Sequence, residues 1–162
     1  MRQTLLGVFV LVSLLSMLAC GDSSRPTSPM ASAAVIVVRA PASIRALPCT
    51  TCADPGDVLA FVSLAIEETA GVGGEVSAID VIVQNAAGVV LEGPGTLVLE
   101  NFLRGGASTN RLSARGTLTL PQIGAHIPGP LRGQLPATMR LTVTFRDDRG
   151  NTTSTLVSVE VL

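Results

Sequence analysis

The sequence has no tryptophan, no tyrosine and no lysine, and its 162 residues include four phenylalanines and one histidine. Without tryptophan and tyrosine the chain lacks the aromatic platforms on which bases and sugars usually stack. Its 11 basic residues, all arginine, against 12 acidic residues give a formal net charge of −1. That balance excludes strong electrostatic attraction to nucleic acid or to an anionic membrane surface, so no nucleic-acid partner is expected.

Reactive side chains are equally scarce. A single histidine excludes a blue-copper site, which needs two histidines and a cysteine. The chain contains no Gly-x-Ser-x-Gly, no His-Glu-x-x-His and no phosphate-binding glycine loop. We therefore expect a protein that is not an enzyme and has no resident cofactor. Charged residues make up 14% and hydrophobic residues 47% of the chain, which excludes a disordered charged tail.

The N-terminus has the pattern of an export signal. Arg2 precedes a continuous apolar stretch, Leu5–Leu18, of 14 residues. A membrane-spanning helix needs about 20 apolar residues, so this stretch is too short to be a permanent anchor. The pattern predicts a secretory signal peptide, helical over its apolar part, at residues 1–19.

The end of this stretch, Met17-Leu18-Ala19-Cys20, resembles the lipobox of bacterial lipoprotein precursors. The resemblance implies cleavage before Cys20 and lipid on its thiol, with the membrane as a partner through that lipid. Met17 departs from the pattern, which prefers leucine there, and the alternative is an ordinary signal peptide with an accidental cysteine. Gly21 stands where aspartate would resemble an inner-membrane retention signal, which favours the periplasmic face of the outer membrane.

Residues 20–34 hold Cys20 and a stretch rich in serine, proline, alanine and glycine without a hydrophobic period. This composition predicts a flexible tether with a typical reach of roughly 20 Å. The folded domain is expected at residues 35–162.

That domain has almost no helical periodicity, whereas alternation of apolar and polar residues recurs along it. Short alternating runs separated by turn signals favour an antiparallel sandwich over βαβ units. Residues 121–136, punctuated by proline and glycine, are expected to form a long connection. The expected strands lie at residues 35–39, 58–69, 76–84, 89–92, 96–100, 111–120, 139–146 and 155–162.

The C-terminal sequence reads Leu-Thr-Val-Thr-Phe at residues 141–145, a turn at 147–151, and Val-Ser-Val-Glu-Val at 157–161. These strands resemble the final hairpin of bacterial immunoglobulin-like and fibronectin-type modules. The resemblance implies an all-β fold, an antiparallel immunoglobulin-like β-sandwich of seven or eight strands. It departs from vertebrate immunoglobulin domains in having no core tryptophan, no tyrosine corner and no cysteine pair linking two sheets.

The same two runs predict part of the core. Val143 and Phe145 should face inward together with Val157, Val159 and Val161 if the runs pair as a hairpin. Because tryptophan and tyrosine are absent, each phenylalanine after the signal peptide should supply a large share of core volume. These are Phe61, Phe102 and Phe145.

Cys49-Thr50-Thr51-Cys52 is the one motif of reactive residues. A disulfide between Cys49 and Cys52 is the favoured interpretation for an exported protein. A redox pair would need a helix start to lower the first thiol's pKa, and Pro55 and Gly56 follow too closely for that. A metal site would need two further ligands besides the cysteines. The chain's one histidine, His126, is expected in the 121–136 loop. Haem attachment is excluded because its motif needs histidine directly after the second cysteine, and Ala53 stands there.

The carboxylates form three groups: Asp54 with Asp57, then Glu67, Glu68 and Glu75, and finally Asp147 with Asp148. Their spacing matches no calcium-binding loop. The aspartates are expected to bond to their own turns, and the glutamates to lie on a solvated strand end.

Taken together, the sequence predicts a noncatalytic, lipid-anchored β-sandwich module of the cell envelope, an interaction or structural module with an envelope protein as partner. The alternative is a periplasmic metal- or small-ligand-binding lipoprotein that uses Cys49, Cys52 and His126. The two predictions separate on whether His126 lies near the two cysteines in the fold.

Overall fold

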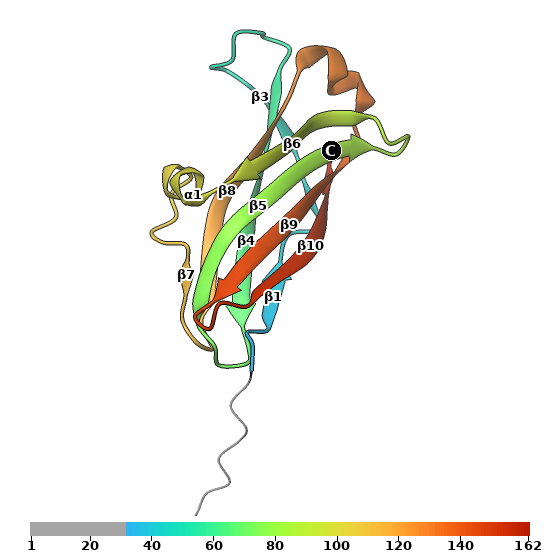
Figure 1. The fold of residues 1–162 in the computed structure, drawn as a ribbon. Coiled ribbons are helices and arrows are strands. Elements are labelled where there is room, and N and C mark those ends of the chain that lie inside the picture. The colour runs from blue at the N-terminus through green and yellow to red at the C-terminus, as the bar shows by residue number, and fades with distance from the viewer. Residues whose placement is uncertain (1–31) are drawn as a thin grey trace, which may run out of the picture.

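The computed structural model describes residues 32–162 (Figure 1). The predicted signal peptide, the lipobox with Cys20 and all but the last three residues of the predicted tether lie outside the described residues.

One sheet is built around β4 (Val58–Glu68). Along one side β4 pairs antiparallel with β8 (Thr117–Ile127). Along the other side it pairs antiparallel with β1 (Ile36–Arg39) at one end and with β3 (Ala46–Pro48) at the other. We call this four-stranded sheet the β4 sheet.

The second sheet has six strands and centres on β9 (Ala137–Asp147). β9 pairs antiparallel with β10 (Thr152–Val161) and with β5 (Gly74–Asn85). β5 in turn pairs with β6 (Val90–Leu97) and, at its other end, with the short β7 (Arg111–Leu112). We call this the β9 sheet. Its outer edge is completed by β2 (Ser43–Ile44), which runs parallel to β10.

The first part of the chain therefore changes sheets twice, from the β4 sheet to the β9 sheet and back. In one sheet β4 lies between β8 and the short strands β1 and β3. In the other sheet the order is β10, β9, β5. This is the connectivity of an immunoglobulin-like β-sandwich, and the fold predicted from the sequence is confirmed. The described residues hold ten strand segments rather than seven or eight. The number is higher because the chain forms the separate short strands β1, β2 and β3 as it changes sheets.

The two inner faces form the core, and the predicted hairpin is part of it. Phe145 lies opposite Thr153, and Val143 opposite Thr155. Phe145, Val143, Val159 and Val161 are fully buried, and Val157 is partly buried. The turn predicted at residues 147–151 is closed by the Asp147 N–H, which donates to the carbonyl of Asn151 at 2.9 Å.

The predicted strand at 111–120 is wrong, because it is two strands in different sheets. After β7 the chain turns at residues 113–116, where the Gly116 N–H donates to the carbonyl of Ser113 at 2.9 Å, and it then enters β8 in the β4 sheet. The predicted connection at 121–136 is likewise wrong in its first half, since β8 continues through Pro121 to Ile127. Pro121 and the positive-φ residue Gln122 lie where the register with β4 shifts, which is where a strand tolerates both.

The predicted strand at 96–100 is also wrong beyond residue 97. β6 passes through the expected break at Gly93–Gly95, and the helix α1 (Leu99–Arg104) follows it. A short 3-10 helix, η1 (Gly129–Gln134), precedes β9. Within residues 32–162 no helix has the length and apolar character to cross a membrane.

The phenylalanines divide between core and surface. Phe102 of α1 and Phe145 are buried, whereas Phe61 is 44% exposed on the outer face of the β4 sheet. Its ring covers Gly124 of β8, where an added Cβ would lie 2.8 Å from a ring carbon. The expectation that each phenylalanine fills the core is therefore wrong for Phe61.

Glu68 is not on a solvated strand end as expected, because it is buried at the end of β4. Its carboxylate accepts the N–H groups of Ala70, Gly71 and Arg115, each at 2.8 Å. Burial alone would raise the pKa of Glu68, but these N–H groups together with that of Val72 hold it below its ordinary value. The side chain thus joins the β4–β5 turn to the segment that leads into β8.

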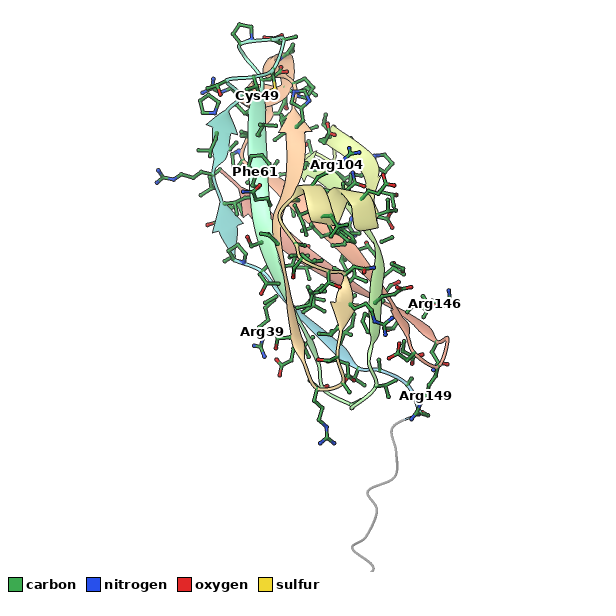
Figure 2. All side chains as sticks on the ribbon, turned by 90° about the vertical axis from the view of Figure 1, so that its left-hand side faces the viewer. Arg39, Cys49, Phe61, Arg104, Arg146 and Arg149 are labelled. Atoms are coloured by element: carbon green, nitrogen blue, oxygen red, sulfur yellow. A yellow bond between two sulfur atoms is a disulfide. The ribbon has the colours of Figure 1, made fainter. Side chains whose placement is uncertain are left out.

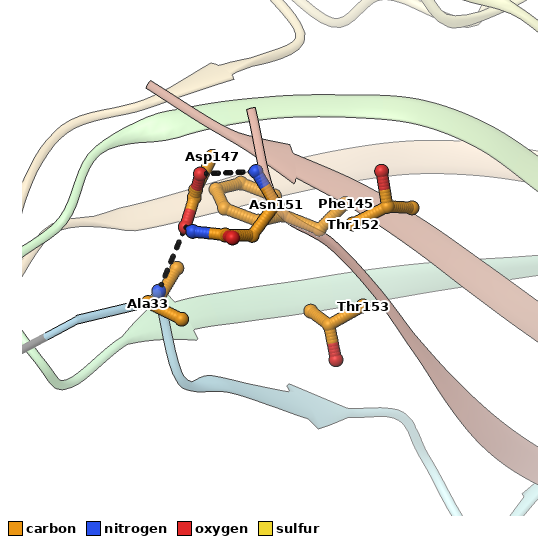
Figure 3. A pocket seen from close by; sticks show the side chains of 7 residues that line it. Ala33, Phe145, Asp147, Asn151, Thr152 and Thr153 are labelled. Atoms are coloured by element: carbon orange, nitrogen blue, oxygen red, sulfur yellow. Dashed lines mark hydrogen bonds between the residues drawn. The ribbon is translucent and has the colours of Figure 1, made fainter. Parts of the chain in front are cut away.

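The described chain begins beside the β9–β10 turn (Figure 3). The Ala34 N–H donates to Oδ2 of Asp147 at 3.1 Å, and the Asn151 amide donates to the carbonyl of Ser32 at 3.3 Å. Ala34 is buried, so contacts with the sandwich extend to the residue before the predicted domain start at residue 35. This point lies at the opposite end of the sandwich from the β3–β4 loop and η1 (Figures 1 and 2).

Candidate functional site

The loop at residues 49–57 joins β3 to β4 at one end of the sandwich, which we call the tip. The Cys49 N–H donates to the carbonyl of Asp57 at 2.9 Å and closes the loop. Within it the Asp57 N–H donates to the carbonyl of Asp54 at 3.2 Å, and Oδ1 of Asp54 accepts the Gly56 N–H at 2.8 Å. The turn expected at residues 54–57 is therefore present, with Asp54 bonded to its own backbone.

Cys49 and Cys52 form a disulfide, with their Cα atoms 5.5 Å apart. The favoured interpretation of the motif is confirmed. Cys49 is buried and Cys52 is half-buried, so the bond lies against the tip rather than projecting from it. In this state neither sulfur is a thiolate, which is the form that attacks substrates and ligates metals.

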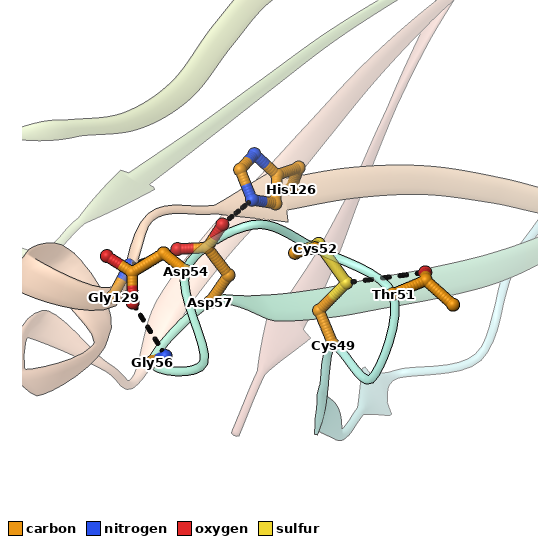
Figure 4. Close-up of polar contacts among 8 residues, drawn as sticks. All are labelled: Cys49, Thr51, Cys52, Asp54, Gly56, Asp57, His126 and Gly129. Carbon is orange, nitrogen blue, oxygen red and sulfur yellow. Dashed lines mark hydrogen bonds and ion pairs between the residues drawn. A yellow bond between two sulfur atoms is a disulfide. The ribbon is translucent and has the colours of Figure 1, made fainter.

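His126 lies in β8 and not in a loop, which corrects the sequence-based expectation. It is opposite Leu59 in the register of β4 and β8. Its neighbours Ala125 and Ile127 are buried, so strand alternation turns the imidazole to the outer face. The ring sits next to the end of the strand, beside the 49–57 loop (Figure 4).

The imidazole is held by Asp57. His126 Nε2 lies 2.6 Å from Oδ2 of Asp57, and Oδ1 of Asp57 accepts the Gly129 N–H at 2.8 Å. The pKa of Asp57 is held below its ordinary value mainly by the hydrogen bond from the Gly129 N–H and next by the bond to His126. Burial acts in the opposite direction and would raise it. The Asp57 side chain is 10% exposed and the His126 side chain 43%, so a nearly buried carboxylate orients an accessible ring.

This arrangement brings together residues that the sequence presented separately. Ligand atoms of Cys52, Asp57 and His126 all lie within 4.8 Å of one another. The sequence singled out Cys52 and His126 but assigned Asp57 to turn chemistry alone. The sequence signal that could have identified Asp57 was its position shortly after the Cys-x-x-Cys motif. The pairing of β4 with β8, which brings His126 beside it, could not be seen in the sequence.

As it stands, the tip offers an oriented imidazole and a carboxylate beside a closed disulfide. A paired carboxylate and imidazole can bind a cation or a polar group, but the sulfurs take no part while they are bonded to each other.

A second hollow lies on the flank between β8 and α1. It has a volume of about 300 Å³, and its lining includes Phe61, Phe102, Arg104 and Gln122. Phe61 and Arg104 mark its position in Figure 2. It holds one cationic side chain beside an exposed aromatic ring and lacks the grouped titratable side chains found at the tip.

The pocket at the start of the described chain has a volume of about 220 Å³ and is bordered by Ala33, Ala34, Phe145 and Asp147. The Asp147 carboxylate there already accepts hydrogen bonds from Ala34, Arg149 and Asn151. These contacts make it the place where the N-terminal segment docks.

No protein-family model matches the sequence, and no curated protein is significantly similar to it. Among solved structures, the chain is similar to a protein designated ApaA from Bordetella pertussis, with a TM-score of 0.52 and 16% identity over 78% of this chain and 92% of that one. It is also similar to the structural genomics target SoR45, with a TM-score of 0.52 and 12% identity over 77% of this chain and 84% of the other. Likeness at this level of identity shows the fold alone.

Proposed function

We propose that this protein is a noncatalytic, lipid-anchored module of the bacterial cell envelope that uses its tip to contact another envelope component. The observation that carries the proposal is the placement of the two ends. The chain enters the sandwich beside the β9–β10 turn, and the tip with Cys49, Cys52 and His126 lies at the opposite end.

This placement sets which end of an anchored domain lies nearer its point of attachment. If Cys20 carries lipid, the residues up to Ser32 form a tether whose reach is roughly 20 Å. The hydrogen bonds at Ala34 and Asn151 fix where the tether joins the domain. The tip is then the end of the domain that is farther from the point of attachment, where it is open to proteins or small ligands of the envelope.

The alternative function, metal or small-ligand binding through Cys49, Cys52 and His126, is supported by the proximity of Cys52, Asp57 and His126. It requires the sulfurs to be released from the disulfide, since a bonded sulfur is not a thiolate ligand. It is compatible with the same anchoring and the same exposed tip.

Detergent phase partitioning of the exported chain tests the anchoring. The wild-type protein should enter the detergent phase, and Cys20→Ala should remain in the aqueous phase or keep its signal peptide. Ser23→Ala retains the thiol and serves as the matched control. If wild type and Cys20→Ala partition identically after signal cleavage, the anchoring proposal is wrong.

Photo-crosslinking from two positions tests the presentation of the tip. Thr50 is exposed on the tip, and Ser32 is exposed where the described chain begins. A crosslinker at Thr50 should capture a protein of the envelope, whereas one at Ser32 should capture membrane lipid. Equal capture of lipid from both positions would contradict the proposed orientation.

A further inference from the structure

We propose that reduction of the Cys49–Cys52 disulfide converts the tip into a Zn²⁺ site with Cys49, Cys52, Asp57 and His126 as its four ligands. This rests on the alternative function above and does not depend on lipid anchoring. The tip would then be a redox-controlled metal site, closed in the oxidised protein and open in the reduced one.

The types of ligand fit zinc. Thiolate sulfur, imidazole nitrogen and carboxylate oxygen are the groups that Zn²⁺ takes in tetrahedral protein sites, and two cysteines separated by two residues are a recurrent spacing in them. The 49–57 loop supplies the two cysteines and the carboxylate, and β8 supplies the imidazole. Four ligands from two connected segments are enough to complete a closed site.

The distances are close to those of such a site. Zinc lies about 2.3 Å from sulfur and about 2.0–2.2 Å from nitrogen or oxygen, so tetrahedral geometry places two of its ligand atoms roughly 3.3–3.8 Å apart. The ligand atoms of Cys52, Asp57 and His126 are within 4.8 Å of one another, and the sulfur of Cys49 is bonded to that of Cys52. The Cys49 sulfur lies outside this group of three, so formation of the site requires the ligand side chains to draw together after reduction and Cys49 to swing inward within the 49–57 loop.

The surroundings prepare two of the ligands. The Gly129 N–H occupies Oδ1 of Asp57 at 2.8 Å and leaves Oδ2 directed at the imidazole. Oδ2 and His126 Nε2 already face each other at 2.6 Å, so an ion entering the site would replace the proton they share. A hydrogen bond to the second oxygen of a ligating carboxylate is the kind of outer contact that orients metal ligands.

The reaction balances as two steps. A dithiol reductant gives two electrons and two protons to the disulfide, which becomes two thiols while the reductant becomes a disulfide. Zn²⁺ then displaces one proton from each thiol and forms two zinc–sulfur bonds, with imidazole and carboxylate completing the set. The proton between His126 Nε2 and Asp57 Oδ2 moves to Nδ1 when the ring is neutral, and to solvent when the ring is charged. Zinc binding should therefore release protons and weaken as the pH falls.

The test uses the full chain with Cys20→Ser in detergent, so that Cys49 and Cys52 are its only thiols. Zinc affinity is measured by calorimetry and by competition with a chromophoric chelator, before and after reduction and removal of the reductant. Reduced protein should bind one Zn²⁺ per chain, and oxidised protein should bind none at the same concentration. Cobalt in place of zinc should give thiolate-to-cobalt charge-transfer absorption in reduced protein alone.

Variants separate the ligands from their neighbours. Asp57→Asn and His126→Gln should each lower the zinc affinity of reduced protein at least as far as the about 10–100-fold typical of losing an outer contact. Asp54→Asn makes the same charge change in the same loop and should leave the affinity unchanged. Because His126 is the chain's one histidine, the ¹⁵N resonances of its ring report ligation in the protein without substitution at the tip.

Three outcomes would overturn the proposal. The proposal is wrong if reduced protein binds zinc no more tightly than oxidised protein, if cobalt gives no charge-transfer band, or if the His126 resonances stay unchanged on saturation with zinc. None of them touches the anchoring proposal, because that is tested on Cys20 by partitioning.

Discussion

At the scale of single residues, two phenylalanines that both lie within long strands have opposite environments. Phe145 is fully buried between the sheets in β9, and Phe61 is 44% exposed in β4. Gly74 of β5 leaves room for the Phe145 ring, since an added Cβ there would lie 2.6 Å from the ring tip. The core is thus closed around one of these rings, and the other rests on the surface over Gly124.

Phe145→Ala should destabilise the protein by about 3–5 kcal/mol, because it removes a large aromatic group from a core that cannot collapse around the space. Phe61→Ala makes the same chemical change and should cost about 1 kcal/mol, since much of that ring is already in water. Chemical denaturation of both variants measures the difference. Equal losses would mean that the inward face of β9 has been assigned incorrectly.

At the scale of elements, the 49–57 loop is fastened at both ends. The disulfide closes its first half, and the Asp57 carboxylate, which accepts the Gly129 N–H and bonds to the His126 ring, fastens its end to η1 and β8. A loop of this length would otherwise be a mobile hairpin connection. Its attachment explains how a surface loop holds a side chain in a fixed relation to a residue 69 positions away.

Cys49 and Cys52 of the native protein should resist alkylation until a reductant is added, and then take two labels. The physical reason is that the disulfide leaves no thiolate to react. Mass spectrometry of alkylated protein carrying Cys20→Ser counts the labels directly. Cys49→Ser is the control, because it leaves Cys52 unpaired and should give one label without reduction.

Two labels on unreduced protein would show that the cysteines are free in solution. The redox-controlled zinc site would then lose its control by oxidation.

At the scale of the whole molecule, three buried carboxylates join segments that are distant in the sequence. Glu68 joins the β4–β5 turn to Arg115, Asp147 joins the β9–β10 turn to Ala34, and Asp57 joins the tip loop to η1. The hydrogen bond from the Asn151 side chain is the main cause that lowers the pKa of Asp147. Burial would raise this pKa, and further hydrogen bonds from backbone N–H groups lower it. All three carboxylates have pKa values below the ordinary range.

The free energy of unfolding should therefore fall in acid. A carboxylate whose pKa is lowered by folding contributes stability that is complete above its unfolded value, here about 4.5 for Glu68 and 3.8 for the aspartates. That contribution is lost as the pH falls through the folded values. Stability should be flat above about pH 5 and decline progressively below it, as followed by denaturation at a series of pH values.

Glu68→Gln isolates one part of this effect. It should cost about 1–3 kcal/mol near neutral pH, because an amide nitrogen would face backbone N–H groups that need acceptors. The decline in acid should also be shallower than in wild type. Glu67→Gln is the matched control: it changes an exposed side chain whose ion pair with Arg39 is worth little. An acid profile unchanged by Glu68→Gln would show that Glu68 titrates alike in the folded and unfolded chain.

The sequence by itself determined the fold class and much of the core. Period-two alternation in residues 139–146 and 155–162 fixed which side chains of this hairpin face inward, since a strand turns alternate residues to opposite faces. The cysteine spacing and the turn at residues 54–57 likewise determined a local disulfide loop. These features depend on neighbours in the sequence, and sequence patterns report neighbours well.

The tertiary structure decided what depends on distant pairing. Residues 111–120 alternate without a break, yet they divide between two sheets, because β7 finds a partner in β5 and β8 in β4. Phe61 lies in an apolar run, residues 58–62, where both faces of the strand carry apolar side chains, so the sequence does not say which face is covered. The tip depends on the register that sets His126 opposite Leu59, which brings the ring beside Asp57 and Cys52. No local pattern encodes that register, because it is set by burial of both sheets at once.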